Sequence, residues 1–134
     1  MDRSSFEILV ERSLNSLPKR FRSKLRNIMI EIEERPSREL LAELGITSGT
    51  LFGLYQGVPL TAREWNYGNV LPDRITIYQR PIEAAAGSPG EIEEIVRETV
   101  VHELGHYFGF DDRALYEIEE EKKRRMKAGD GRKR

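Results

Sequence analysis

The stretch from Pro89 to Phe108 predicts one long amphipathic helix, and this helix most constrains the fold. Ser88 and Glu91 have the spacing of a capping box, with proline at the first helical position. Gly109 is a natural stop. An apolar stripe at helical spacing runs between these ends: Ile92, Val96, Val100 and Leu104. The rest of the chain must therefore supply a core against which this stripe packs.

Shorter elements are expected on both sides of this helix. Helical patterns cover residues 4–17, which Pro18 ends, and 37–45, which Gly45 ends. A helical turn is expected over 81–87 and a final helix over about 112–127. Alternating or apolar runs predict three strands: residues 27–34, in which Ile28, Ile30 and Ile32 share a buried face, residues 51–55, and residues 74–80.

A chain of 134 residues fits a single domain, which we place at residues 1–121. Residues 122–134 hold eight Lys or Arg against one Asp, and we expect a disordered basic tail there. The sequence contains no cysteine, so a bound metal would need nitrogen and oxygen ligands. Since it also lacks an apolar run of about 20 residues and a signal segment, a cytoplasmic protein without membrane contact is expected.

Both histidines of the chain lie in the long helix, within the sequence "HELGH". His102 and His106 are four residues apart, so a helix places them on one face, where both can bind the same metal ion. Glu103 follows one step, about 100°, around the helix, beside the metal rather than on it. Glu103 is therefore predicted to act as a general base toward a metal-activated water.

A catalytic zinc site needs a third protein ligand and an open position. If the chain reverses at Gly109, Asp112 returns to the same point and is the predicted third ligand. Further candidates for this position are Asp111, Glu117, Glu119 and Glu120. Hydrolysis of an amide also needs a second donor for the oxyanion, for which the candidates are Tyr107, Tyr116, Tyr78 and Arg113.

The segment "HELGHYFGFDD" resembles the HExxHxxGxxD form of the zincin metallopeptidase motif. Three further segments, "LFGLYQGVPL", "LPDRITIYQRP" and "ETVVHELGHYFG", make the chain similar to the minimal zincin-like metallopeptidases, a family of small bacterial proteins. The resemblance implies an α+β fold, with a small mixed sheet packed against an N-terminal backing helix and an active-site helix. It also implies zinc held by His102, His106 and Asp112, with Glu103 as the catalytic base.

Two other functions compete with a peptidase. A binding or regulatory module would hold zinc in a closed shell of four protein ligands. A zinc-dependent ribonuclease would make use of the basic tail, although such enzymes carry three histidines and have no glutamate after the first. Nucleic acid is therefore not the expected partner. The expected partner is a peptide or protein substrate in extended conformation, lying along an exposed edge strand, for which residues 74–80 are the candidate.

Overall fold

The structure is a computed structural model that describes residues 1–57 and 73–108. The predicted final helix, the basic tail and the domain limit at residue 121 fall outside these residues. Within 1–57 and 73–108, no helix is both long and apolar enough to cross a bilayer.

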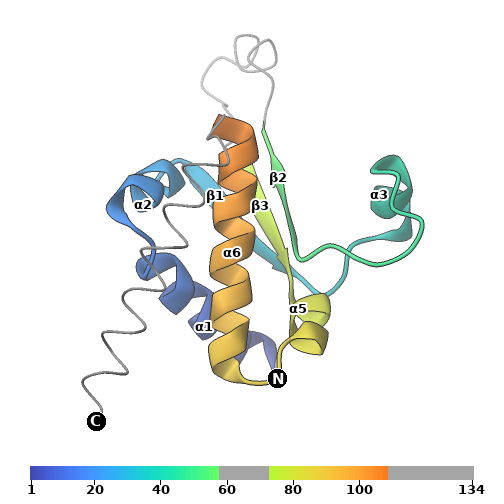
Figure 1. The fold of residues 1–134 in the computed structure, drawn as a ribbon, viewed down its shortest axis with the longest axis horizontal. Helices are drawn as coiled ribbons and strands as arrows, with labels where there is room; N and C mark the ends of the chain where they lie inside the picture. The colour runs from blue at the N-terminus through green and yellow to red at the C-terminus, as the bar shows by residue number, and fades with distance from the viewer. Residues whose placement is uncertain (58–72, 109–134) are drawn as a thin grey trace.

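Helices surround a small mixed sheet (Figure 1), as an α+β fold requires. The elements are α1 (Arg3–Asn15), α2 (Lys19–Leu25), β1 (Ile28–Glu33), α3 (Arg38–Glu43), β2 (Gly53–Gln56), β3 (Asp73–Tyr78), α5 (Gln79–Ala85) and α6 (Pro89–Phe108). Among the described residues the strand order is β1-β3-β2, in which β1 runs parallel and β2 antiparallel to β3.

The strand β3 lies in the centre of this sheet, and the prediction that residues 74–80 form an exposed edge is wrong. It pairs with β1 on one side and with β2 on the other. Both of its faces are covered, because Thr76 and Tyr78 are buried as well as Ile75 and Ile77. The strand also ends at Tyr78, since Gln79 already begins α5.

The core lies between the sheet and the helices α1 and α6. Phe6 and Val10 of α1 and Val96 of α6 belong to one buried cluster, together with Ile75 and Ile77 of β3. The predicted stripe of α6 is fully part of this cluster. The expected N-terminal backing helix is thus confirmed: α1 packs against α6.

Local hydrogen bonds explain where the principal helices begin. The Ser88 hydroxyl accepts a bond from the Glu91 N–H at 3.2 Å, as in the predicted capping box. The Glu91 carboxylate accepts from the Gly87 N–H at 2.6 Å, one residue earlier than a standard box. The N-terminus of α1 is capped by Asp2, whose carboxylate accepts from the Ser5 N–H at 2.8 Å.

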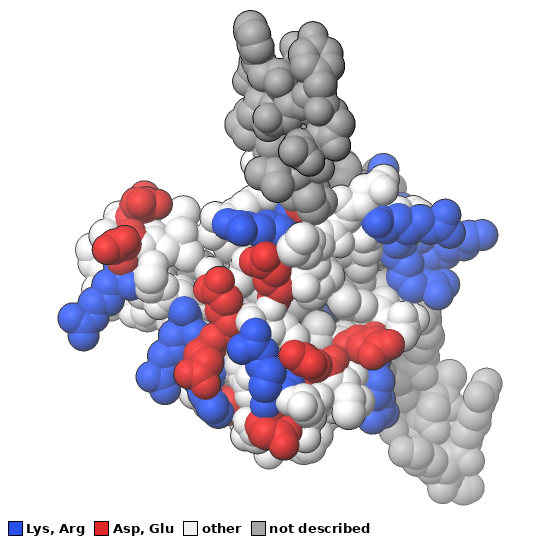
Figure 2. Space-filling view, turned by 180° about the vertical axis from the view of Figure 1, so that it is seen from behind, with Lys and Arg blue, Asp and Glu red and all other residues white. Residues whose placement is uncertain are grey.

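Two helices differ from expectation. The pattern after Pro18 did not predict α2, whose sequence "KRFRSKL" buries only Phe21. Its four Lys and Arg residues are exposed, and Figure 2 shows basic side chains gathered on the side where α2 lies. The predicted helix α3 is present, but none of its residues is buried, and Figure 1 shows it standing away from the sheet.

Among residues 1–57 and 73–108, β1 pairs on one side only, and a side chain of α1 covers part of its other edge. The Arg3 guanidinium donates to the main-chain carbonyl of Ile32, and it also lies 3.6 Å from Glu7. Glu31 and Glu33 bring further charges to the same edge. At this edge of the sheet, the Arg3 guanidinium therefore occupies the Ile32 carbonyl, and the carboxylates of Glu31 and Glu33 lie nearby.

The strand β2 passes very close to α6 at Gly53. A Cβ atom at this position would lie 2.7 Å from Thr99 Cγ2 and 3.0 Å from the Thr76 carbonyl oxygen. The first distance is shorter than a real Cβ contact allows and the second is at the tight limit, so in the Gly53→Ala variant β2 or the Thr99 side chain must shift. We expect this substitution to lower the free energy of unfolding by about 1–3 kcal/mol, measured by urea denaturation.

The control for this prediction is Gly90→Ala, since the added Cβ meets only Ser88 Oγ at 3.9 Å. Alanine suits the first turn of a helix better than glycine does, so this variant should be as stable as the wild type or slightly more stable. Wild-type stability in Gly53→Ala would show that the approach of β2 to α6 is looser than described.

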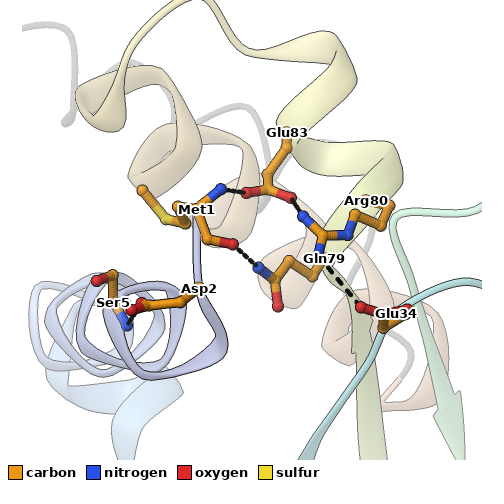
Figure 3. Close-up of polar contacts among 7 residues, drawn as sticks. All are labelled: Met1, Asp2, Ser5, Glu34, Gln79, Arg80 and Glu83. Carbon is orange, nitrogen blue, oxygen red and sulfur yellow. Dashed lines mark hydrogen bonds and ion pairs between the residues drawn. The ribbon is translucent and has the colours of Figure 1, made fainter.

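A polar network joins the start of the chain to α5 (Figure 3). The ammonium group of Met1 lies 2.7 Å from Glu83, and the Met1 carbonyl accepts from Gln79 at 3.0 Å. Arg80 donates to Glu83 at 2.9 Å and to Glu34 at 3.2 Å. Burial raises the pKa of Glu83, but the hydrogen bonds from the ammonium, Gln79 and Arg80 outweigh it, and this pKa lies below its ordinary value.

The lowered pKa makes Glu83 a source of acid sensitivity. The folded state binds a proton at this carboxylate less readily than the unfolded state does, so ionised Glu83 stabilises the fold above the unfolded pKa. This contribution is lost as the pH falls from about 5 through the folded pKa. In denaturation curves, the stability advantage of wild type over Glu83→Gln should shrink over this range. A constant difference between the two proteins would contradict the prediction.

Candidate metal centre

The two predicted histidine ligands lie on one continuous helix. The α-helix α6 runs through His102, Glu103 and His106 without a break. The expectation that local geometry sets these positions one turn apart is therefore met at the level of the backbone.

The described side chains of this segment divide clearly between core and solvent. Leu104 and Gly105 are buried, whereas His102 is exposed and Glu103 is half-buried. The apolar residue Leu104 takes the core side, and the imidazole of His102 lies on the solvent side of the helix. The neighbouring carboxylate of Glu103 lies at the boundary between core and solvent, where a proton acceptor can reach water.

The predicted third ligand is not among the described residues. Asp112 and the alternatives Asp111, Glu117, Glu119 and Glu120 all lie outside the described residues. Within the part of the chain that the structure describes, no three residues of metal-binding type come together. The donor types nevertheless suit zinc: two imidazoles on one helix, with nitrogen and oxygen as the available ligand atoms.

Tyr78 is a poor candidate for the oxyanion donor. It alternates with Ile77, which packs in the core on the α6 side, so its side chain lies on the opposite face of the sheet. Only 2% of it is exposed, and burial, with the nearby charge of Glu33, raises the pKa of its hydroxyl. The other candidates, Tyr107, Tyr116 and Arg113, belong to the part of the chain whose side chains are not described.

The sequence did not predict a pair of polar residues on the α6 side of the sheet. The Tyr55 hydroxyl donates to Asp73 Oδ2 at 2.7 Å. Asp73 opens β3 and is only 8% exposed. The available signal was weak: an aromatic residue near the end of one strand, and a carboxylate at the start of the next.

Comparisons with known proteins decide the family. The sequence model of the zincin-like metallopeptidases matches residues 25–122. The chain belongs to the zincin-like metallopeptidase family. Its helices and small mixed sheet agree with the fold of that family.

A solved structure with a similar fold is that of a conserved hypothetical protein from Thermo thermophilus. The two chains are 26% identical, with a TM-score of 0.54, over 81% of this zincin-like chain and 94% of the other. No curated protein matches the chain in sequence. Membership of the family makes zinc binding and peptidase chemistry the leading candidates for this site.

Proposed function

We propose that the chain is a zinc-dependent metallopeptidase, in which His102, His106 and Asp112 hold the metal and Glu103 is the general base. One observation carries the proposal: in a chain of the zincin-like family, α6 turns Leu104 inward and leaves His102 open to solvent beside Glu103. This arrangement supports a metal site on the solvent side of α6, near its C-terminal end, with Glu103 beside it as the base.

Zinc, when bound, supplies a Lewis acid that activates water and polarises a peptide carbonyl. The protein supplies the proton transfer. Glu103 accepts the proton of the attacking water and returns a proton to the amine nitrogen as the C–N bond breaks. The half-buried position of Glu103 suits this role, because the carboxylate reaches water without being fully solvated.

The substrate proposed here is an extended peptide. Because β3 lies in the centre of the sheet, the candidate edge is β2. Among the described residues, β2 pairs with a strand on only one side, and it also contacts α6. Main-chain pairing along β2 would accept many sequences, since it uses no side chain of the substrate. It would also bring the substrate alongside the helix that carries His102.

The test combines metal content with hydrolysis. Purified protein should bind one zinc ion, cleave members of a peptide library, and lose activity with a chelator. His102→Ala should weaken zinc binding by more than about 100-fold, since loss of an outer-shell partner alone costs 10–100-fold. The exposed residue Glu98 on the same helix offers the control Glu98→Gln, which should bind zinc normally.

Three outcomes separate the candidate functions. Protein that neither contains nor rebinds zinc would refute the proposal. Zinc in a closed shell of four side chains, without hydrolysis, would identify a binding or regulatory module. Cleavage of RNA but not of peptide, unaffected by replacement of Glu103, would identify a ribonuclease. A cytoplasmic location remains a prediction from the sequence.

A further inference from the structure

The hydrogen bond between Tyr55 and Asp73 holds a carboxylate in a fixed place. Asp73 is nearly buried, and burial of a carboxylate is costly unless hydrogen bonds stabilise it. A bond of 2.7 Å from a tyrosine hydroxyl to a carboxylate is of the strong, charge-assisted kind. The pair is therefore a built feature of the sheet and not a chance surface contact.

This carboxylate belongs to the face of the sheet that α6 covers. Side chains alternate along a strand, so Asp73 shares its face with Ile75 and Ile77. Both isoleucines pack in the cluster that contains Val96 and Val100 of α6. Asp73 thus points to the side of the sheet on which the metal-binding helix lies.

The position of the pair along the helix follows from the contact at Gly53. There β2 meets α6 at Thr99, and from this point both elements run in the same direction (Figure 1). Tyr55 lies about 7 Å further along the strand, at roughly 3.3 Å per residue. Glu103 lies about 6 Å further along the helix and on the same side as Thr99, at 1.5 Å per residue and 3.6 residues per turn. Tyr55 and Glu103 are therefore at the same level.

Continuing the two elements brings a histidine position to the level of Asp73. Position 106 comes seven residues, or nearly two turns, after Thr99. Its backbone therefore faces nearly the same side of the helix as Thr99 does, about 10 Å further along the helix axis. Asp73 lies about 13 Å beyond Ile77, the partner of Gly53 in the sheet. The beginning of β3 and the second histidine position of α6 thus lie at similar heights on facing sides.

We propose that Asp73, held by Tyr55, is a positioning residue of the metal centre: its carboxylate accepts a hydrogen bond from the ring N–H of a metal-binding histidine of α6. By helical phase this histidine is His106. Such a bond fixes the tautomer and orientation of the imidazole and raises its basicity as a ligand. The inference rests on the proposed zinc site and adds to it two residues outside the motif.

Zinc affinity, measured by competition with a chromogenic chelator, tests the role directly. Asp73→Asn should bind zinc about 10–100-fold more weakly than wild type. Tyr55→Phe keeps the charge and the ring but releases the carboxylate, and should weaken binding in the same direction, by about tenfold.

Two controls act on the opposite face of the same sheet. Glu31→Gln removes one negative charge, as Asp73→Asn does, but Glu31 is paired with Arg74 at 3.8 Å. Gln56→Ala removes the acceptor of Arg74 at 2.7 Å, next to Tyr55 in β2. Both should bind zinc as the wild type does, because neither side chain lies on the α6 face.

Nitrogen NMR of the histidine rings measures an effect that Asp73 would not have if it only stabilised the fold. The zinc-loaded wild type should show a slowly exchanging ring N–H, and this signal should be lost in folded Asp73→Asn. If wild-type protein binds no zinc, the proposed function fails and this inference with it. If wild type binds zinc but folded Asp73→Asn and Tyr55→Phe bind it within twofold of wild type, only the positioning role is refuted.

Discussion

Glu103→Gln is expected to lower peptide turnover by about 10²–10⁴-fold while zinc affinity stays near that of the wild type. Glutamine has the shape of glutamate but cannot take the proton of the attacking water. Since Glu103 is proposed to act beside the metal and not on it, the loss should fall on kcat. Steady-state kinetics on a cleaved peptide, together with zinc titration, separates the two effects.

Glu98→Gln is the matched control for this experiment, since it makes the same chemical change at an exposed position of α6. It should keep wild-type kcat and KM. If Glu103→Gln retained full turnover, another residue would have to act as the base. If it lost zinc together with activity, Glu103 would be a ligand, and the assignment of roles within the motif would be wrong.

Phe6→Ala is expected to lower the free energy of unfolding by about 3–5 kcal/mol. Phe6 is fully buried, in the cluster that joins α1 to α6 and the sheet. Removal of the ring leaves a cavity that surrounding side chains fill only in part. For a domain whose total stability is about 5–15 kcal/mol, this loss would lower the midpoint of denaturation strongly.

Ile8→Ala provides the comparison on the same helix, because Ile8 is 58% exposed. It should change stability by no more than about 0.5 kcal/mol. Equal stabilities of the two variants would mean that α1 does not back the active-site helix as described. Zinc affinity measured in folded Phe6→Ala would then show whether the backing helix also affects the metal site.

Patterns that arise from local periodicity were predictable from the sequence. The stripe of α6 and the Ser88 cap are confirmed, since both depend on residues within a few turns of one another. The isoleucines of β1 share one face that packs against the core, but they are half-buried and not fully buried as predicted, while Met29 between them is exposed. Helix α2 was missed because its basic sequence shows no apolar stripe and only Phe21 anchors it.

Features that depend on distant residues were not predictable. Residues 74–80 were predicted to form an exposed edge, but the place of a strand in a sheet depends on which distant strands pair with it. The burial of Thr76 and Tyr78 was missed because the prediction considered only the face that carries the isoleucines. Tyr55 and Asp73 meet across 18 positions of sequence, and only the antiparallel pairing of β2 with β3 brings them together.

The contact of Arg3 with the Ile32 carbonyl has a consequence for the behaviour of the protein in concentrated solution. An exposed edge strand can pair with strands of neighbouring molecules, and such pairing can lead to fibrils. Here an incoming strand would have to displace a guanidinium and then approach Glu31 and Glu33. Self-assembly through β1 is thereby disfavoured. Helix α1, which backs the core, therefore also protects this edge of the sheet from pairing with another molecule of the same protein.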